Sequence, residues 1–401
     1  MAKHFVTWLL IFVCCAALGR AEPRAPEPVT APPAAATIGP KPKPAPPRDA
    51  QAVEAAMQRG IAFLIRAQNK DGSWGSARRT KGSDVYAPVP GAHHAFRAAT
   101  TALCISALIE VGGEKSDVRE AIDRGEKWML GNLPMLRRAE ADTIYNVWGH
   151  GFGIQALVRL ERRNQDAAAK TKIRELIASQ VERLLRYEFV TGGWGYYDFH
   201  HHAQKPATMS TSFTTATCLV ALHEARALGI EVPQKTIDRA IAAIKRQRKP
   251  DFSYLYAHDL RQQPMRDINR PGGSLGRSQA CNYALRLWGD EQVTDAVLVT
   301  WLDRLFARGM WLDIGRKRPI PHESWFAVAA YFYYYGYYYA SLCIEQLPEA
   351  QRGPHLDQLA HTLLARQEKD GSWWDFPLYD YHQPYGTAFA LMTLHRCRAK
   401  P

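Results

Sequence analysis

One short phrase, Asp-Gly-Ser-Trp, occurs twice in this chain, at residues 71–74 and again at residues 370–373. Each copy follows a stretch with helical periodicity and leads into a second, more apolar stretch. A degenerate third copy, Gly-Gly-Trp-Gly, lies between them at residues 192–195. A turn phrase that recurs at the same place in a helix pair is typical of a repeat architecture. This repeat constrains the fold more than any other feature of the sequence.

Hydrophobic periodicity predicts six pairs of helices. The first helix of each pair is amphipathic, with apolar residues spaced three and four apart, as in residues 53–64. The second helix is apolar on nearly all sides, as in residues 98–108 and 325–342, which is typical of a helix buried all round. The first helices are expected to begin near Ala52, Val118, Lys170, Lys235, Val293 and Leu356, and the second near Ala95, Val147, Thr211, Leu275, Ser324 and Tyr385.

Amphipathic helices that alternate with buried ones predict two concentric layers. Six pairs with modest connections can close into a ring, which removes the capping repeats that an open solenoid needs. We therefore expect an all-α fold over residues 50–398, a single α6/α6 toroid of six helix hairpins. An open superhelix is the alternative.

The helix pairs closed by these turns resemble the QW repeat of squalene-hopene cyclases. The residues that carry the resemblance are Arg59, Gly60, Leu64, Gln68, Gly72 and Trp74 in the first repeat, and Leu363, Gln367, Gly371 and Trp373 in the last. The resemblance extends to the β-subunit group of protein prenyltransferases, which shares the α/α toroid. It covers about residues 50–398. If the chain is an enzyme, it implies prenyltransferase-like or cyclase-like transfer, or isomerase chemistry.

The chain departs from both families at their functional motifs. Asp380, Tyr381 and His382 are similar to the prenyltransferase stretch that carries a zinc-binding His, but the companion Asp and Cys are missing from residues 319–324. His322, Glu323 and His382 could still hold a divalent metal such as zinc as a two-His, one-carboxylate site. The Asp-rich DXDD motif of triterpene cyclases does not occur, so a cyclase mechanism has no visible acid.

The N-terminal residues are expected to direct export. Lys3 and His4 precede an apolar run at residues 5–18, and small residues follow, which is the pattern of a signal peptide over residues 1–21. The run is too short for a stable membrane anchor, so no transmembrane span is expected in the mature chain. Residues 22–49 contain ten prolines and are predicted to be a disordered linker. The mature protein should be periplasmic or secreted.

Cysteine usage and charge add two further expectations. The five cysteines after residue 21 are predicted to be small buried core residues and not a disulfide framework. The formal net charge is +12, with Lys and Arg scattered over the outer helices, which indicates a generally cationic surface. No nucleic-acid-binding motif is present, and no nucleic-acid partner is expected.

The candidate site is the rim where the buried helices begin. Parallel inner helices bring six N-termini together, and each has free N–H groups and partial positive charge. The default site is this concave mouth. The catalytic candidates are His150, His322, Glu323, Asp380 and His382, with one His as base or metal ligand and Glu323 or Asp380 as its partner. The ligand-binding candidates are His94, Trp148, Arg277, Trp325, Tyr331, Tyr335 and Tyr385.

Three functions remain open from the sequence. The first is a toroid that binds an apolar or isoprenoid-like ligand, with or without chemistry, because aromatic walls suit such chains. The second is a polysaccharide-active lyase or hydrolase, because sugars also stack on aromatic rings. The third is a non-catalytic interaction module. The sequence shows no clear carboxylate pair for glycoside hydrolysis.

Overall fold

The computed structural model describes residues 31–82, 89–113, 115–200, 204–207, 210–323 and 325–398. Residues 32–401 form one compact unit. The predicted signal peptide, residues 1–21, lies outside the described residues.

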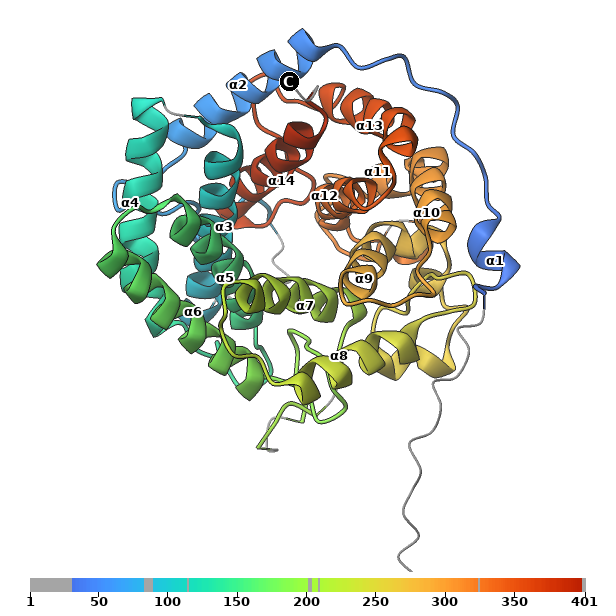
Figure 1. Ribbon diagram of the computed structural model, residues 1–401, viewed down its shortest axis with the longest axis horizontal. Coiled ribbons are helices and arrows are strands. Elements are labelled where there is room, and N and C mark those ends of the chain that lie inside the picture. Colours follow the sequence, from blue (N-terminus) through green and yellow to red (C-terminus); the bar gives the residue numbers. More distant parts are fainter. Residues whose placement is uncertain are drawn as a thin grey trace, which may run out of the picture. The chain divides into compact units, whose positions relative to one another are not determined.

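Twelve of the described helices in this unit form two concentric layers (Figure 1). The outer helices are α2 (Ala50–Arg66), α4 (Ser116–Asn132), α6 (Ala167–Arg186), α8 (Gln234–Gln247), α10 (Asp295–Arg308) and α13 (Glu349–Leu364). The inner helices are α3 (Pro90–Val111), α5 (Asn146–Arg163), α7 (Ser212–Ala227), α9 (Leu275–Leu287), α12 (Phe332–Glu345) and α14 (His382–Arg396). The last inner helix, α14, packs against both α12 and α3, which closes the ring. The predicted all-α toroid is confirmed.

The two layers follow from the two kinds of helix pattern. Outer helix α2 begins after Asp49, whose carboxylate caps the free N–H groups of the first turn, and it buries a stripe that includes Met57 and Leu64. Inner helix α3 is buried on most sides. Among the described helices, only α3 is long and apolar enough to cross a membrane, and most of it is covered by neighbouring helices of the ring.

The repeated turns fasten the outer layer to the inner layer. Trp74 is fully buried, and its indole Nε1 donates to the carbonyl of Leu64 at 2.7 Å, while its backbone N–H donates to Thr101 Oγ1 at 3.0 Å. Trp373 repeats the arrangement with the Leu363 carbonyl at 2.9 Å and Thr387 Oγ1 at 3.0 Å. The degenerate third copy does the same through Trp194 Nε1, Leu184 O and Thr215 Oγ1.

The Gln and Gly residues of the turns link each pair to the next. Gln68 Nε2 donates to the Ala121 carbonyl on α4, and Gln367 Nε2 donates to the Ala56 carbonyl on α2. The second of these bonds joins the last repeat to the first. Gly371 has a φ of 93°, and a Cβ there would lie 2.6 Å from the Arg59 carbonyl oxygen, so the close approach requires glycine.

The fifth inner helix begins later than the sequence predicted. We expected it near Ser324, but α12 begins at Phe332. The chain between α10 and α12 forms α11 (Met310–Asp313) and a short 3₁₀ turn, η5 (Trp325–Ala327). Phe326 and Ala327 have φ values of 62° and 49°, which a right-handed helix does not accept. The apolar composition of residues 325–331 was therefore misread as helix.

The Pro-rich segment is a second correction, because residues 32–49 run along the outer layer, while residues 22–30 of the predicted linker lie outside the described residues. They include α1 (Ala34–Thr37), which packs against α10. Lys41 Nζ lies 2.5 Å from Asp303 Oδ2, and Arg48 Nη1 lies 2.6 Å from Asp357 Oδ1. Arg304 donates to the carbonyls of Ala35 and Ile38. An extended, proline-rich chain has free carbonyls and little entropy to lose, so side chains of the outer helices can hold it without a core.

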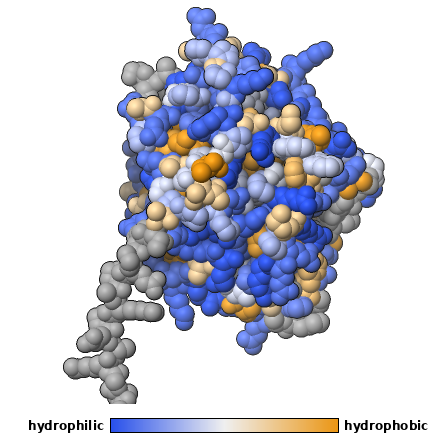
Figure 2. Space-filling view, turned by 90° about the vertical axis from the view of Figure 1, so that its right-hand side faces the viewer, coloured by the Kyte–Doolittle hydropathy of each residue, from blue (hydrophilic) through white to orange (hydrophobic). Residues whose placement is uncertain are grey.

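The face of the molecule in Figure 2 is largely hydrophilic, with apolar residues in separate small groups. Among the described residues, the five cysteines are buried and unpaired, as the sequence predicted.

Candidate functional site

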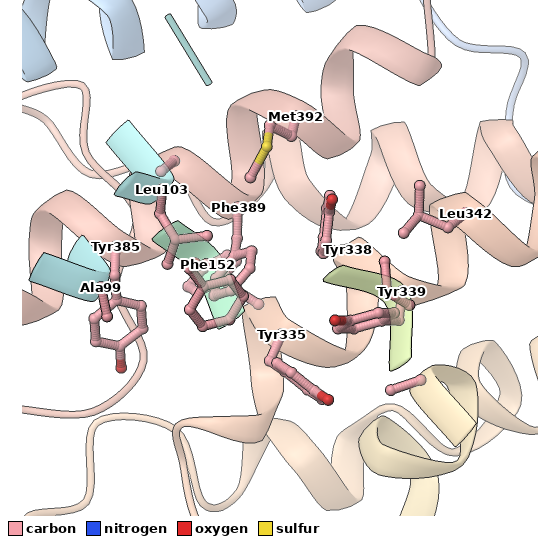
Figure 3. Close-up of a cluster of buried hydrophobic side chains, with 14 of the residues drawn as sticks. Ala99, Leu103, Phe152, Tyr335, Tyr338, Tyr339, Leu342, Tyr385, Phe389 and Met392 are labelled. Atoms are coloured by element: carbon pink, nitrogen blue, oxygen red, sulfur yellow. The ribbon is translucent and has the colours of Figure 1, made fainter. Parts of the chain in front are cut away.

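A cavity of about 140 Å³ lies among the first halves of the inner helices. Its walls are formed by Phe96, Ala99, Thr100, Leu103, Tyr145, Trp148, Phe152, Tyr196, Phe213, Tyr331, Phe332, Tyr335, Leu378, Tyr385 and Phe389. Eleven of these residues are aromatic, and none carries a formal charge. Figure 3 shows part of this wall, where Phe152 and Phe389 lie close together between Tyr385 and Tyr335. The cavity is therefore an aromatic, nearly apolar chamber.

The phenol groups of the wall bond to other parts of the protein. Tyr335 Oη donates to the Phe213 carbonyl at 3.1 Å and lies 3.0 Å from Thr217 Oγ1. Tyr145 Oη donates to Tyr197 Oη at 2.8 Å. Because these hydroxyls already have partners, the wall offers aromatic faces more than hydrogen-bonding groups to a ligand.

Side chains fill the centre of the ring on the side of the cavity where the inner helices end. Tyr338, Tyr339, Leu342 and Met392 continue the buried cluster of Figure 3 towards the C-terminal ends of α12 and α14. An ion-pair network lies at those ends: Arg159 binds Glu110 at 2.8 Å and Glu224 at 3.0 Å, and Arg396 binds Glu110 at 3.0 Å. The cavity therefore lies on the side of the ring where the inner helices begin.

A buried carboxyl group that was not predicted from the sequence contacts the cavity wall on the side that faces away from the cavity. Asp375 is fully buried, and its Oδ1 accepts a 2.5 Å hydrogen bond from Tyr385 Oη. Its Oδ2 accepts from the backbone N–H of Tyr334 at 3.1 Å. Burial raises the pKa of Asp375 to about 7. The available signal was an acidic residue placed directly after two tryptophans, Trp373 and Trp374.

The structure places four of the predicted ligand-binding residues on the cavity wall. They are Trp148, Tyr331, Tyr335 and Tyr385. Their role in binding stays a prediction. Tyr331 and Tyr335 come from adjacent turns at the start of α12, while Trp148 comes from α5 and Tyr385 from α14.

The remaining predicted rim residues do not meet at one cavity, so the expected constellation is wrong in its geometry. His150 is fully buried, with Nδ1 2.7 Å from Gln180 Oε1, and it stacks on Tyr187. Burial lowers the pKa of His150 to about 4. Arg277 is also buried, and its guanidinium donates to the carbonyls of Tyr254 and Gly273. Both side chains hold the fold together and neither reaches the mouth.

Two further groups of these residues lie in separate surface clefts. His94 shares one cleft with Arg97 and Trp128. His322, Glu323 and Trp325 share another, in which Trp325 is 64% exposed.

Asp380 and His382 line neither of these clefts. Asp380 pairs with Arg78 at 2.6 Å, and His382 packs edge-on against Trp374 with Nδ1 2.7 Å from the Tyr379 carbonyl.

The predicted metal site is not formed by the described residues. No three His, Cys, Asp or Glu side chains converge among them in a way that could hold a metal ion. His322 bonds the Ala327 carbonyl through Nδ1, while His382 bonds Tyr379, so the two histidines belong to different local structures. His322, Glu323 and His382 therefore do not make up the two-His, one-carboxylate arrangement.

Solved structures with low sequence identity share this architecture. No family model matches the chain. An inactive variant of the α-1,6-mannanase GH76A of Salegentibacter sp. HEL1_6, in complex with α-1,6-mannotetrose, matches with a TM-score of 0.53 and 11% identity, over 86% of this chain and 98% of that one. A possible member of the GH105 family from Klebsiella pneumoniae matches with a TM-score of 0.53 and 12% identity, over 88% and 94%.

A terpene cyclase lies at a slightly greater structural distance. The type II terpene cyclase MstE from Scytonema matches with a TM-score of 0.47 and 12% identity, over 87% of this chain and 98% of that one. At identities this low, the mannanase and GH105 matches speak to the fold and not to the activity. This chain is an α/α toroid, and its function depends on the chemistry of its own cavity.

Proposed function

We propose that this toroid binds an apolar, isoprenoid-like ligand in its central cavity. The observation that carries the proposal is the wall itself, with eleven aromatic residues of fifteen and no formal charge. Ligand sites in proteins are concave and mainly apolar, with a few polar groups that fix orientation. A hydrocarbon chain gains from burial against such a wall, whereas a sugar would lose hydrogen bonds to water that this wall replaces poorly.

A polysaccharide-active function has less support from the cavity. Hydrolysis of a glycosidic bond usually needs two carboxyl groups on opposite sides of the bond. The described lining residues include no Asp or Glu, and Asp375 is separated from the cavity by Tyr385.

A catalytic version of the proposal would use the same wall. Aromatic faces stabilise a positive charge that develops on a bound hydrocarbon, as transfer or isomerase chemistry on isoprenoids requires. Asp375 would act through Tyr385, because its carboxyl oxygen bonds the phenol and the phenol lines the cavity. We therefore assign Asp375 as a positioning residue for Tyr385.

Native mass spectrometry of the purified protein tests the binding proposal. We expect a retained adduct that transfers to organic solvent and has the mass and solubility of an apolar lipid. A protein without an adduct that binds no isoprenoid alcohol in titration, but does bind mannooligosaccharides, would replace this proposal with the polysaccharide-active one.

Export is a separate part of the proposal. Lys3, His4 and the apolar run at residues 5–18 support cleavage near Gly19 or Ala21 and a periplasmic or secreted mature protein. N-terminal sequencing of the protein from the extracytoplasmic fraction should begin close to residue 20 or 22. Exclusive recovery of protein with an intact N-terminus from the cytoplasm would refute export.

A further inference from the structure

A groove on the outer face of the ring holds residues 32–48, which we call the arm. The arm leaves the start of α2 and runs along the outside of α13 to α10, where α1 packs (Figure 1). The surface beneath it, which we call the outer groove, includes Thr300, Asp303 and Arg304 of α10 and Asp357 and Gln358 of α13. The arm therefore reaches from the first repeat across the sixth repeat to the fifth.

The arm is held by polar contacts and not by a core of its own. Only Ala36 is buried among residues 32–48. Arg304 donates to the carbonyls of Ala35 and Ile38 at 2.6 Å and 2.8 Å, on the exposed side of α10. Polar contacts at a surface can break and form again without opening the interior of a protein. Release of the arm would therefore expose little apolar surface.

The arm and the outer groove have opposite charges. Residues 32–48 contain Lys41, Lys43 and Arg48 and no Asp or Glu. In the groove, Asp303 lies 2.5 Å from Lys41, and Asp357 lies 2.6 Å from Arg48. Complementary charges of this kind favour one partner segment over others. The outer groove is therefore suited to a basic, proline-rich segment.

Open space remains on both sides of the arm. A cleft of about 260 Å³ lies between Gly39 and the start of α9, and a cleft of about 480 Å³ lies beside residues 41–46, over Phe306 and His361. A tightly packed segment leaves few voids larger than a water molecule. The outer groove is therefore wider than the arm, and the arm can enter it from solvent.

The ring itself leaves room for a segment at this place. In the turn of the fourth repeat, Phe252 takes the position that Gly72 has in the first turn, because each N–H donates three residues back at 2.9 Å. Gly72 lies against the next outer helix, where a Cβ would overlap the Arg124 carbonyl oxygen. Phe252 carries a side chain at a φ of 59°, so α10 cannot press on its turn in this way. Arg304 of α10 instead donates to the Asp251 carbonyl at 3.0 Å through one nitrogen and to the arm through another.

Every copy of the chain carries both the arm and the outer groove. The arm joins α2 at Asp49 without an intervening loop. In an extended, proline-rich conformation its residues span about 50 Å. An arm of this length can lie over a neighbouring ring as well as over its own. The same bonds form in both arrangements, so exchange between copies loses few contacts.

We propose that two copies of this protein exchange their arms, so that the arm of each copy occupies the outer groove of the other. The partner is a second copy because this segment fits this groove in charge and in the positions of its carbonyl groups. Within one chain the effective concentration of the arm is roughly millimolar, so the exchanged form increases with protein concentration. The exchange does not depend on the ligand of the central cavity.

A charge-swapped pair of variants tests the exchange. One variant carries Asp303→Lys and Asp357→Lys, and the other carries Lys41→Glu and Arg48→Glu. Both are made in the chain from residue 22, which keeps the arm and omits the apolar run at residues 5–18. Each variant alone repels its own arm and should be monomeric. Mixed in equal amounts, they should form a dimer of twice the mass in light scattering, because each arm then fits only the groove of the other copy. The chain with all four substitutions should be monomeric at the same concentration.

The matched control has the same gain in charge outside the groove. Asp123→Lys combined with Glu182→Lys changes carboxylates that are 62% and 72% exposed on α4 and α6. Mixed with the arm variant, this control should stay monomeric, which excludes attraction between net charges. Asp303 also contacts His355. If Asp303→Lys does not fold, Asp357→Lys in one copy and Arg48→Glu in the other repeat the test.

Disulfide trapping locates the exchanged arm. A Cβ at Gly39 would lie 3.2 Å from Thr300 Cγ2, within reach of a disulfide between Gly39→Cys and Thr300→Cys. The double variant should form this bond within one chain. The two single variants, mixed at high concentration, should form a disulfide-linked dimer at least about tenfold faster than Gly39→Cys mixed with Ala168→Cys. Ala168 is exposed on α6, so this second mixture measures cross-linking by collision.

Two results would overturn the proposal. The first is a charge-swapped mixture that stays monomeric while both variants are folded by circular dichroism. The second is cross-linking of the Gly39→Cys and Thr300→Cys copies no faster than in the control mixture, although the double variant closes its own disulfide. Either result would confine the arm to its own ring.

Discussion

Tyr385 and Asp375 form a hydrogen-bonded pair, 2.5 Å from Oη to Oδ1, that joins the cavity wall to a buried carboxyl group. The described residues place no cation in an ion pair with Asp375, and burial raises its pKa from 3.8 to about 7. Burial therefore favours the protonated form of this carboxyl group, which contacts a residue that a bound ligand would touch.

The raised pKa predicts a specific dependence of stability on pH. Between about pH 4 and pH 7 the folded protein keeps a proton on Asp375 that the unfolded chain has released, so the free energy of unfolding falls as pH rises through this window. The loss contributed by this group is at most roughly 4 kcal/mol. Urea unfolding at pH 4.5 and pH 7.5 measures it. Asp375→Asn should show a smaller fall than the wild type, and an equal fall in both proteins would contradict the assignment.

The tryptophans of the repeated turns should be the strongest single contributors to stability. Trp74→Ala and Trp373→Ala each remove a fully buried ring and an indole hydrogen bond, and should each destabilise by ~3–5 kcal/mol. Trp194→Ala should behave alike, because the third turn makes the same contacts. Chemical denaturation is the measurement, with Trp325→Ala as the control because Trp325 is 64% exposed. Unchanged unfolding midpoints for the turn variants would show that these turns do not hold the repeats together.

The ordered Pro-rich segment makes a measurable contribution. Arg48 binds Asp357 at 2.6 Å and the Cys397 carbonyl at 2.8 Å. Arg48→Ala should lower the free energy of unfolding by about 1–2 kcal/mol, since it removes the guanidinium that pairs with a partly buried carboxylate. Arg186→Ala is the matched control, because its ion pair with Glu182 is about 70% exposed on both sides and should contribute less than about 0.5 kcal/mol. Equal values for the two variants would mean that the segment is only loosely held.

The ring could be predicted from the sequence because its signals are local. Each helix pair has its own periodicity, and each clear turn has its own Gly and Trp, so the six pairs and the closed ring followed without knowledge of distant contacts. The prediction failed at residues 325–331, where the same apolar composition is compatible with a loop and with a helix. Only the backbone of Phe326 and Ala327, which is left-handed, separates the two.

The predicted site was less accurate than the predicted fold. The position of a residue within its repeat does not determine the direction in which its side chain points. His150 and Trp148 are two residues apart on α5, yet His150 points to Gln180 on α6 and Trp148 lines the cavity. The connections before the inner helices also differ in length, which places His94, His322 and Asp380 in separate surroundings. Aromatic residues at the start of the inner helices were the better guide, since four of them line the wall.

The buried carboxyl group could not be predicted for a physical reason. Asp375 reaches the cavity through a hydrogen bond to Tyr385, ten residues later in the chain. Such a pair depends on how the turn after Trp373 packs against the first turn of α14, and periodicity carries no information about that contact.

Ligand binding inside the ring is best tested by filling the cavity. Ala99 lines the wall, so Ala99→Phe should fill much of the cavity, while Ala168→Phe adds the same group to the exposed surface of α6. Titration of a fluorescent isoprenoid alcohol into each folded protein should give binding at least about tenfold weaker for Ala99→Phe and unchanged for Ala168→Phe. Wild-type affinity in Ala99→Phe, with melting temperature and circular dichroism preserved, would show that the ligand does not occupy the central cavity.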